Sequence, residues 1–112
     1  MTVRIEFIKS KKELTLPIIK LTKSRNGKTG TATFIFVNPS LFQLKEFKMN
    51  TIMGMYLLWE NKQIKTNDIK IFFKNGNPYV IKSFLIFKNS SEWFLFLNFM
   101  NYYSKETGLY FN

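Results

Sequence analysis

Two Asn-Gly pairs, each set between runs of β-branched and aromatic residues, constrain the fold of this chain more than any other feature. Asn26-Gly27 separates residues 18–23 from residues 31–37, and Asn75-Gly76 separates residues 69–74 from residues 79–87. A two-residue hairpin turn needs positive φ, which Asn and Gly tolerate, so an Asn-Gly pair between two such runs is a strong hairpin signal. The sequence therefore predicts two β-hairpins.

Further strand patterns lie outside these hairpins. Residues 3–7 alternate between apolar and charged side chains, which is the pattern of a half-buried strand. Residues 52–59 and 63–66 also have strand character, and Gly54 indicates a bulge or a close backbone approach in the first of them. We expect residues 9–12 to form a polar connection.

The C-terminal part of the chain changes to a helical period. Apolar residues recur there at the spacing of one helix face: Trp93, Phe96, Leu97, Met100 and Tyr103. A capping residue followed by Glu92 precedes this stripe in a capping-box arrangement, and Gly108 is a suitable C-terminal stop. The pattern predicts a helix from about residue 90 to residue 105.

The order of these elements sets the fold class. A chain of 112 residues is too short to fill two cores, so we expect residues 1–112 to form a single domain. A run of strands followed by one helix is typical of an α+β protein. We expect an antiparallel β-sheet built from hairpins, with about five to six strands and the C-terminal α-helix packed on it.

The residue types that are missing restrict the chemistry. The chain has no Cys and no His, which excludes a disulfide, a thiolate nucleophile, an iron–sulfur cluster, the usual zinc site and a Ser-His-Asp triad. The carboxylates are scattered, and nothing in their spacing points to a catalytic pair. We therefore expect a protein that is not an enzyme and that holds no cofactor and no metal.

The charge balance indicates an anionic partner. The formal net charge is +10, which favours nucleic acid, a membrane surface or an acidic protein face. Nucleic-acid readers usually favour Arg, whereas 15 of the 17 cations here are Lys. Lys, Asn, Phe and Ile also have AT-rich codons, so an AT-rich genome explains part of the charge. No apolar run approaches the roughly 20 residues that span a bilayer, and we expect a soluble or peripheral protein.

The first hairpin is rich in cations and hydroxyl groups, contributed by Lys20, Thr22, Lys23, Ser24, Arg25 and Lys28. One interpretation is a solvated turn whose lysines protect an edge strand from aggregation. A second is a docking surface for an acidic partner. A third is β-augmentation, in which an extended segment of another protein pairs with the unpaired backbone groups of an edge strand.

The predicted helix is apolar on nearly every side. Phe94, Leu95, Phe99 and Tyr102 lie off its main stripe, and between Trp93 and Met100 only Asn98 is polar. These residues could widen the core face of the helix. Alternatively, they form an exposed apolar patch that meets another protein or a membrane-proximal surface, which is the interpretation we favour.

Several short blocks carry a family resemblance through their order and spacing. They are residues 21–27, residues 30–36 followed by Pro39, residues 54–57, residues 73–78, Glu92-Trp93 with Phe96, Phe99 and Met100, and Gly108-Leu109. Together they cover residues 3–111 and resemble the photosystem II reaction-centre 13 kDa protein family (Psb subunit twenty-eight), a family of photosystem II assembly factors. The chain departs from the family pattern at Asn26, where Asp is usual, and at Phe94, Leu95 and Asn98, where charged helix residues are usual.

The resemblance implies a non-catalytic factor for photosystem II biogenesis. Such a factor binds assembly intermediates that contain the larger chlorophyll-binding core antenna and the reaction-centre subunits. It binds at the stromal side of the plastid thylakoid membrane, or at the cytoplasmic side in a cyanobacterium. The C-terminal tail of the antenna subunit is understood to extend the sheet of the factor. The resemblance also implies peripheral membrane association through protein, no bound pigment, no nucleic-acid partner and a monomer when free.

Residue by residue, the partner site predicted here consists of Lys20, Thr22, Lys23, Ser24, Arg25, Lys28, Phe94, Leu95 and Tyr102. The alternative function is a small basic nucleic-acid-binding module, with Lys on phosphates and sheet aromatics stacked on bases. Basic residues and exposed aromatics on one sheet face would favour that alternative. An unpaired sheet edge beside the basic hairpin would favour protein docking.

Overall fold

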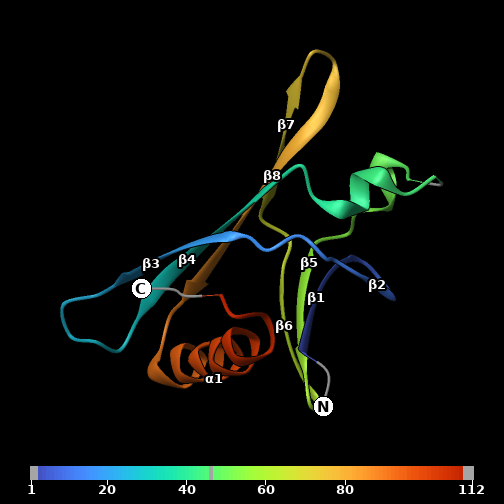
Figure 1. Cartoon of the computed structure of the whole chain (residues 1–112). Helices are drawn as coiled ribbons and strands as arrows, with labels where there is room; N and C mark the ends of the chain where they lie inside the picture. The colour runs from blue at the N-terminus through green and yellow to red at the C-terminus, as the bar shows by residue number, and fades with distance from the viewer. Residues whose placement is uncertain (1–2, 46, 110–112) are drawn as a thin grey trace.

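A computed structural model describes residues 3–45 and 47–109 and confirms the α+β class (Figure 1). The strands are β1 (Val3–Ile8), β2 (Lys11–Lys12), β3 (Ile18–Lys23), β4 (Gly30–Val37), β5 (Met55–Trp59), β6 (Lys62–Thr66), β7 (Ile69–Lys74) and β8 (Asn77–Phe87). Two short 3-10 helices, η1 (Ser40–Gln43) and η2 (Met49–Thr51), precede β5, and the helix α1 (Ser90–Thr107) follows β8.

The strands form two antiparallel sheets rather than the single sheet of five to six strands that the sequence predicted. The first sheet has the order β2-β1-β5-β6, and the second has the order β3-β4-β8-β7. Helix α1 packs against β1 and β5 of the first sheet and against β8 of the second. The expectation for residues 9–12 was also wrong, because Lys11 and Lys12 pair with β1 as the short edge strand β2.

The two Asn-Gly hairpins are confirmed, but their turns differ. In the second hairpin Asn75 and Gly76 have φ of 53° and 81°, as a two-residue turn between Lys74 and Asn77 requires. In the first hairpin only Gly27 has positive φ, at 69°, and the turn spans more residues. The Ser24 N–H donates to the Thr29 carbonyl at 3.0 Å, which closes this wider loop.

Gly54 lies at a close backbone approach, which the sequence had indicated. A Cβ at this position would lie only 2.5 Å from the carbonyl oxygen of Thr66 and 2.9 Å from Oδ1 of Asn67. Strand β5 begins directly after it, at Met55, rather than at residue 52. Gly54 thus lets the start of β5 pass close to the end of β6.

The core between the sheets and the helix is built largely from aromatic rings. Phe87 and Phe96 stack with ring centroids 4.6 Å apart, and Phe7 meets Phe36 edge to face at 5.0 Å. Phe99, placed off the main stripe by its spacing, is fully buried and packs against Trp59 at 5.3 Å. Leu97 is only partly buried, so the core face of α1 is rotated towards Phe99.

The helix begins and ends almost as predicted. The Asn89 side chain accepts a hydrogen bond from the Glu92 N–H at 2.9 Å, and Gly108 ends the helix with φ of 78°. The Glu92 carboxylate accepts from the N–H of Lys88, one residue before the position that a capping box uses. Within the described residues, no helix has the length and apolar character needed to cross a membrane.

Candidate docking surface

One edge of strand β3 pairs with no other described strand. It pairs with β4 from Ile18 opposite Ile35 to Lys23 opposite Gly30, and it is the first strand of its sheet. Alternate backbone N–H and C=O groups of an edge strand point away from the sheet and are available to another extended chain. The basic hairpin therefore carries the free edge that β-augmentation requires.

Internal hydrogen bonds order the tip of this hairpin. The Ser24 hydroxyl donates to Oδ1 of Asn26 at 2.6 Å and accepts from the Thr29 N–H at 3.2 Å. The same Asn26 oxygen accepts from the Lys28 N–H at 2.9 Å. Ser24, predicted as a partner contact, is half-buried and holds the loop together, so its hydroxyl is already used within the chain.

The other predicted hairpin residues, Lys20, Thr22, Lys23, Arg25 and Lys28, are exposed. The ion pairs among the described residues lie elsewhere, between Arg4 and Glu6 and between Lys62 and Glu60. Because side chains alternate along a strand, Lys20 and Thr22 lie on one face of β3, and Lys23 lies on the other with Leu21. The hairpin therefore presents positive charge on both of its faces and at its tip, and none of the described carboxylates neutralises it.

Gly30 joins the hairpin to the helix. A Cβ on Gly30 would lie 2.8 Å from Cζ3 of the Trp93 indole, so the buried ring lies directly against the glycine backbone. The ring of Phe87, the residue opposite Gly30 on β8, lies 5.5 Å from the same indole. The first turn of α1 is thereby held at the base of the basic hairpin.

The three predicted helix contacts differ in their exposure. Phe94 is 61% exposed and Leu95 is 37% exposed in the first two turns of α1. Leu95 lines a groove of about 230 Å³ together with Ile86 and Lys65. Tyr102 is half-buried against the core and lies about 12 Å farther along the helix than Phe94. The fold therefore brings Phe94 and Leu95 to the hairpin end of the molecule and leaves Tyr102 apart.

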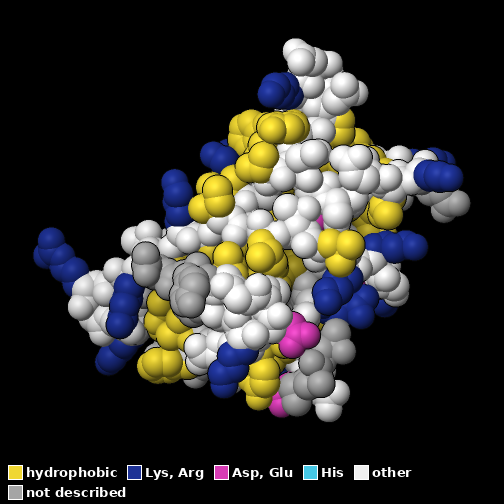
Figure 2. All heavy atoms as spheres, in the orientation of Figure 1, with side chains coloured by type: hydrophobic (Ala, Val, Ile, Leu, Met, Phe, Trp, Pro, Cys, Tyr) yellow, Lys and Arg dark blue, Asp and Glu magenta, His cyan; other side chains and the backbone are white. Residues whose placement is uncertain are grey.

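Sequence reasoning missed a second surface, on the side of the second sheet that faces away from the core. By register and alternation this outer face consists of Ile18, Lys20 and Thr22 of β3, Thr31, Thr33, Ile35 and Val37 of β4, Val80, Lys82, Phe84 and Ile86 of β8, and Lys70 and Phe72 of β7. Figure 2 shows Lys and Arg side chains along the margin from the β3–β4 hairpin to the β7–β8 hairpin, with hydrophobic side chains between them. The apolar character of β8 on both of its faces was the available signal.

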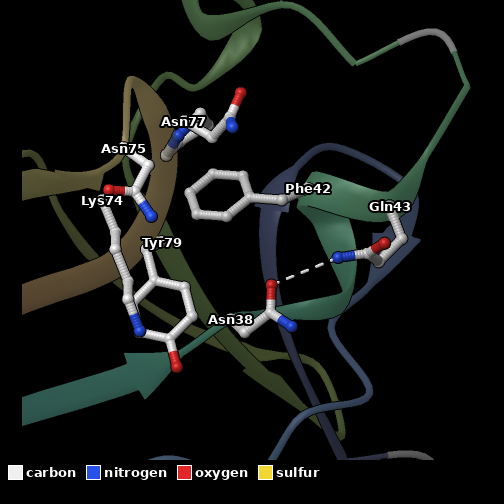
Figure 3. A pocket seen from close by; sticks show the side chains of 8 residues that line it. Asn38, Phe42, Gln43, Lys74, Asn75, Asn77 and Tyr79 are labelled. Carbon is white, nitrogen blue, oxygen red and sulfur yellow. Dashed lines mark hydrogen bonds between the residues drawn. The ribbon is translucent and has the colours of Figure 1, made fainter.

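A polar cleft of about 460 Å³ lies beside the β7–β8 turn. Its lining combines the amides of Asn38, Gln43, Asn75 and Asn77 with Lys74, Pro78 and the rings of Phe42 and Tyr79. Figure 3 shows the Phe42 ring pointing into this cleft and the Gln43 amide donating to Asn38, at 3.2 Å. None of the described lining residues is acidic. The amides offer hydrogen bonds but no nucleophile with an adjacent base.

The described residues do not form a metal centre. No group of three or more Cys, His, Asp or Glu residues lies in position to hold an ion in this part of the chain. The surface features that remain are the edge of β3, the basic tip, the exposed residues of α1 and the outer face.

Comparison with known proteins supplies the family. A family model described as Psb28 protein matches residues 5–111. The chain is 41% identical to the photosystem II reaction center Psb28 protein of Trieres chinensis over 111 residues, which are 99% of this chain and 96% of the relative. It is 41% identical to the protein of the same name in Phaeodactylum tricornutum, over 100% of this chain and 97% of the relative. The Psb28 protein of Nostoc punctiforme is 39% identical over 95% of this chain and 92% of its own length.

Proposed function

Because the chain belongs to the Psb28 family of photosystem II proteins, we propose that it is an assembly factor that binds photosystem II intermediates. Psb28 is a non-catalytic photosystem II protein, in agreement with the expectation that the chain is not an enzyme. Its place is the thylakoid, where photosystem II resides. The proposed partners are the larger chlorophyll-binding core antenna and the reaction-centre subunits, met at the stromal side in a plastid or at the cytoplasmic side in a cyanobacterium.

The free edge of β3 carries this proposal. An extended tail of the antenna subunit that pairs with β3 would become a fifth strand of the second sheet. Backbone hydrogen bonds would supply much of the affinity, and alternate side chains of the tail would meet the two faces of the hairpin.

The basic tip would orient the encounter. Lys23, Arg25 and Lys28 are exposed and form no ion pair with another described residue, so acidic side chains or a terminal carboxylate of the partner would be drawn to them. Complementary charge of this kind raises the association rate and rejects wrong partners more than it adds affinity. The exposed Phe94 and Leu95, at the same end of the molecule, would contribute apolar contact area beside the paired edge.

Co-purification from solubilised thylakoids tests the proposal. A tagged protein should capture antenna-containing intermediates, and the triple variant Lys23→Glu, Arg25→Glu, Lys28→Glu should capture roughly tenfold less, because it repels acidic groups. The control Lys9→Glu, Lys45→Glu, Lys48→Glu changes the net charge equally at exposed sites away from the hairpin and should bind normally.

The helix contacts are tested in the same assay. Phe94→Glu should weaken capture, whereas Asn101→Glu, which adds the same charge at another exposed position of α1, should not. Unchanged capture by the hairpin variant, or equal losses in the hairpin variant and its control, would contradict the site assignment.

One observation favours the alternative of nucleic-acid binding. Lys20, Lys70 and Lys82 share the outer face with the rings of Phe72 and Phe84. The other apolar residues on that face are aliphatic and offer no ring on which a base could stack. Gel shifts with single-stranded RNA and DNA across a salt series decide this point: tight binding with a steep salt slope would favour the nucleic-acid module.

A further inference from the structure

The outer face of the second sheet is unusually apolar for a surface in contact with water. The solvated face of an antiparallel sheet normally carries polar side chains. Here Ile18 is 55% exposed, Ile86 is 66% exposed and Phe72 is 44% exposed. The remaining members of the face are other apolar residues, Lys and Thr, with no carboxylate among them.

The lysines of this face lie along its apolar side chains. The Nζ atom of Lys82 lies 5.3 Å from the centroid of the Phe72 ring, and that of Lys70 lies 5.9 Å from the Phe84 ring. A lysine in such a position covers apolar surface with its aliphatic stem and keeps its ammonium group at the boundary with water. This arrangement suits a boundary between an apolar layer, which the aliphatic stems contact, and a negatively charged layer, which the ammonium groups contact.

From these observations we propose that the outer face rests on an anionic lipid surface. The charge is complementary in sign, because the strand residues of the face include three lysines and no acidic residue, and lysines attract lipid phosphates or sulfonates. Two carboxylates lie at its margin: Asp68, whose carbonyl accepts from the Phe84 N–H at 2.9 Å, and Glu92, which lines a groove with Ile86. Lys is depleted in protein interfaces, whereas lysines at a membrane boundary extend to the headgroups. The exposed aliphatic side chains would enter the headgroup region, and the thylakoid membrane would thereby orient the protein.

This inference goes beyond the proposed function, in which the membrane association runs through protein. The docking site proposed above uses the edge of β3, the hairpin tip and the first turns of α1. The outer face uses the flat side of the same sheet, and the residues that belong to both surfaces are Ile18, Lys20 and Thr22 of β3. Protein-free vesicles therefore test the outer face without testing the assembly partner.

Tryptophan fluorescence can locate the lipid contact. Both native tryptophans, Trp59 and Trp93, are almost fully buried, so they report little on events at the surface. Phe72→Trp places a probe on the outer face, and Phe94→Trp places a matched probe on the helix, where Phe94 is 61% exposed. With vesicles of phosphatidylcholine containing about one-third phosphatidylglycerol, the emission of Phe72→Trp should shift to the blue and that of Phe94→Trp should not.

Co-sedimentation with the same vesicles measures the contribution of the charges. The double variant Lys70→Gln, Lys82→Gln should reduce the partition coefficient roughly thirtyfold, because each lysine near an anionic surface contributes about a fivefold factor. The matched control Lys9→Gln, Lys48→Gln has the same net charge, and its loss should be several times smaller. Wild-type protein should not sediment with pure phosphatidylcholine.

The outcomes separate the possibilities. A blue shift confined to Phe72→Trp, together with the selective loss in Lys70→Gln, Lys82→Gln, would support lipid contact through the outer face. Equal shifts at both probes, equal losses in both double variants, or no sedimentation of the wild-type protein with anionic vesicles would overturn it. If the hairpin variant fails to capture photosystem II intermediates but still binds vesicles, the result supports the hairpin as the assembly site and leaves the lipid contact of the outer face intact.

Discussion

At the scale of single residues, Gly30 has the sharpest structural role. Its backbone is in an ordinary conformation, so the constraint is space: a Cβ would lie 2.8 Å from both the Thr22 carbonyl and the Trp93 ring. Gly30→Ala should therefore lower the free energy of unfolding by about 1–3 kcal/mol, measured by urea denaturation. Thr31→Ala, at the exposed next position, should change it by less than about 0.5 kcal/mol. Equal effects in the two variants would show that Trp93 yields to the new methyl group.

Tyr103 gives the protein a specific alkaline sensitivity. Burial raises the pKa of its hydroxyl above the ordinary value, and the negative charge of Glu13 raises it further. The unfolded chain then releases this proton above about pH 10 while the folded chain retains it, so stability is fully present below that pH and falls as the pH rises.

The corresponding variant is Tyr103→Phe. Between about pH 10 and pH 11 the wild-type free energy of unfolding should fall more steeply than that of Tyr103→Phe, by up to about 1.4 kcal/mol per pH unit. The other tyrosines and the lysines contribute equally to the free energy of unfolding of both proteins, so their titration cancels in the difference. Parallel curves in urea denaturation across this range would show that Tyr103 ionises normally in the folded protein.

At the scale of elements, local chemistry predicted most of the structure. The Asn75-Gly76 turn and the limits of α1 follow from residues that act on their immediate neighbours, and both were found close to the predicted positions. Phe99 was misplaced because the apolar residues of α1 occur on several sides, and only the ring of Trp59 on β5 decides which side is buried. The wide first turn depends on the Ser24 side chain, a contact that the Asn-Gly pattern does not reveal.

The edge of β3 makes a prediction for hydrogen exchange. In the free protein, amides of residues 18–23 that point away from β4 should exchange quickly, because they have no partner in the sheet. Binding of an antenna-containing intermediate should slow those amides by an order of magnitude or more if an added strand pairs with them. The edge strand β7 of the same sheet is the internal control. Protection found on β7 and not on β3 would place the partner at the opposite edge.

At the scale of the whole molecule, the division into two sheets was beyond the reach of sequence patterns. Strand β1 pairs with β5, so that Val3 lies opposite Trp59, and nothing in the two segments specifies this distant pairing. Only part of the candidate site was predicted, because the rest also depends on pairing between strands that are distant in sequence. The basic hairpin is local in sequence, whereas the outer face is assembled from four strands and becomes visible only when their register is known.

The pairing order shows that most lysines of the strands lie on edge strands. Each of the four edge strands carries two of them: Lys11 and Lys12 on β2, Lys20 and Lys23 on β3, Lys62 and Lys65 on β6, and Lys70 and Lys74 on β7. The cations of the inner strands are Arg4 on β1 and Lys82 on β8. Charged residues on edge strands oppose edge-to-edge pairing between copies of a protein. On β3 the same charges would still admit an acidic partner segment, so edge protection and selective docking are compatible.

This distribution predicts that the free protein is a monomer at about 0.1 M salt, where the Debye length is about 10 Å and the edges of two copies repel each other. Sedimentation equilibrium should give the mass of one chain, 13.4 kDa. Lys20→Ser, Lys23→Ser removes the charges from the one edge proposed for augmentation and should shift the protein towards dimers. Lys9→Ser, Lys48→Ser, with the same net charge, should leave it monomeric. A wild-type dimer that persists at low salt would show that edge repulsion does not control association.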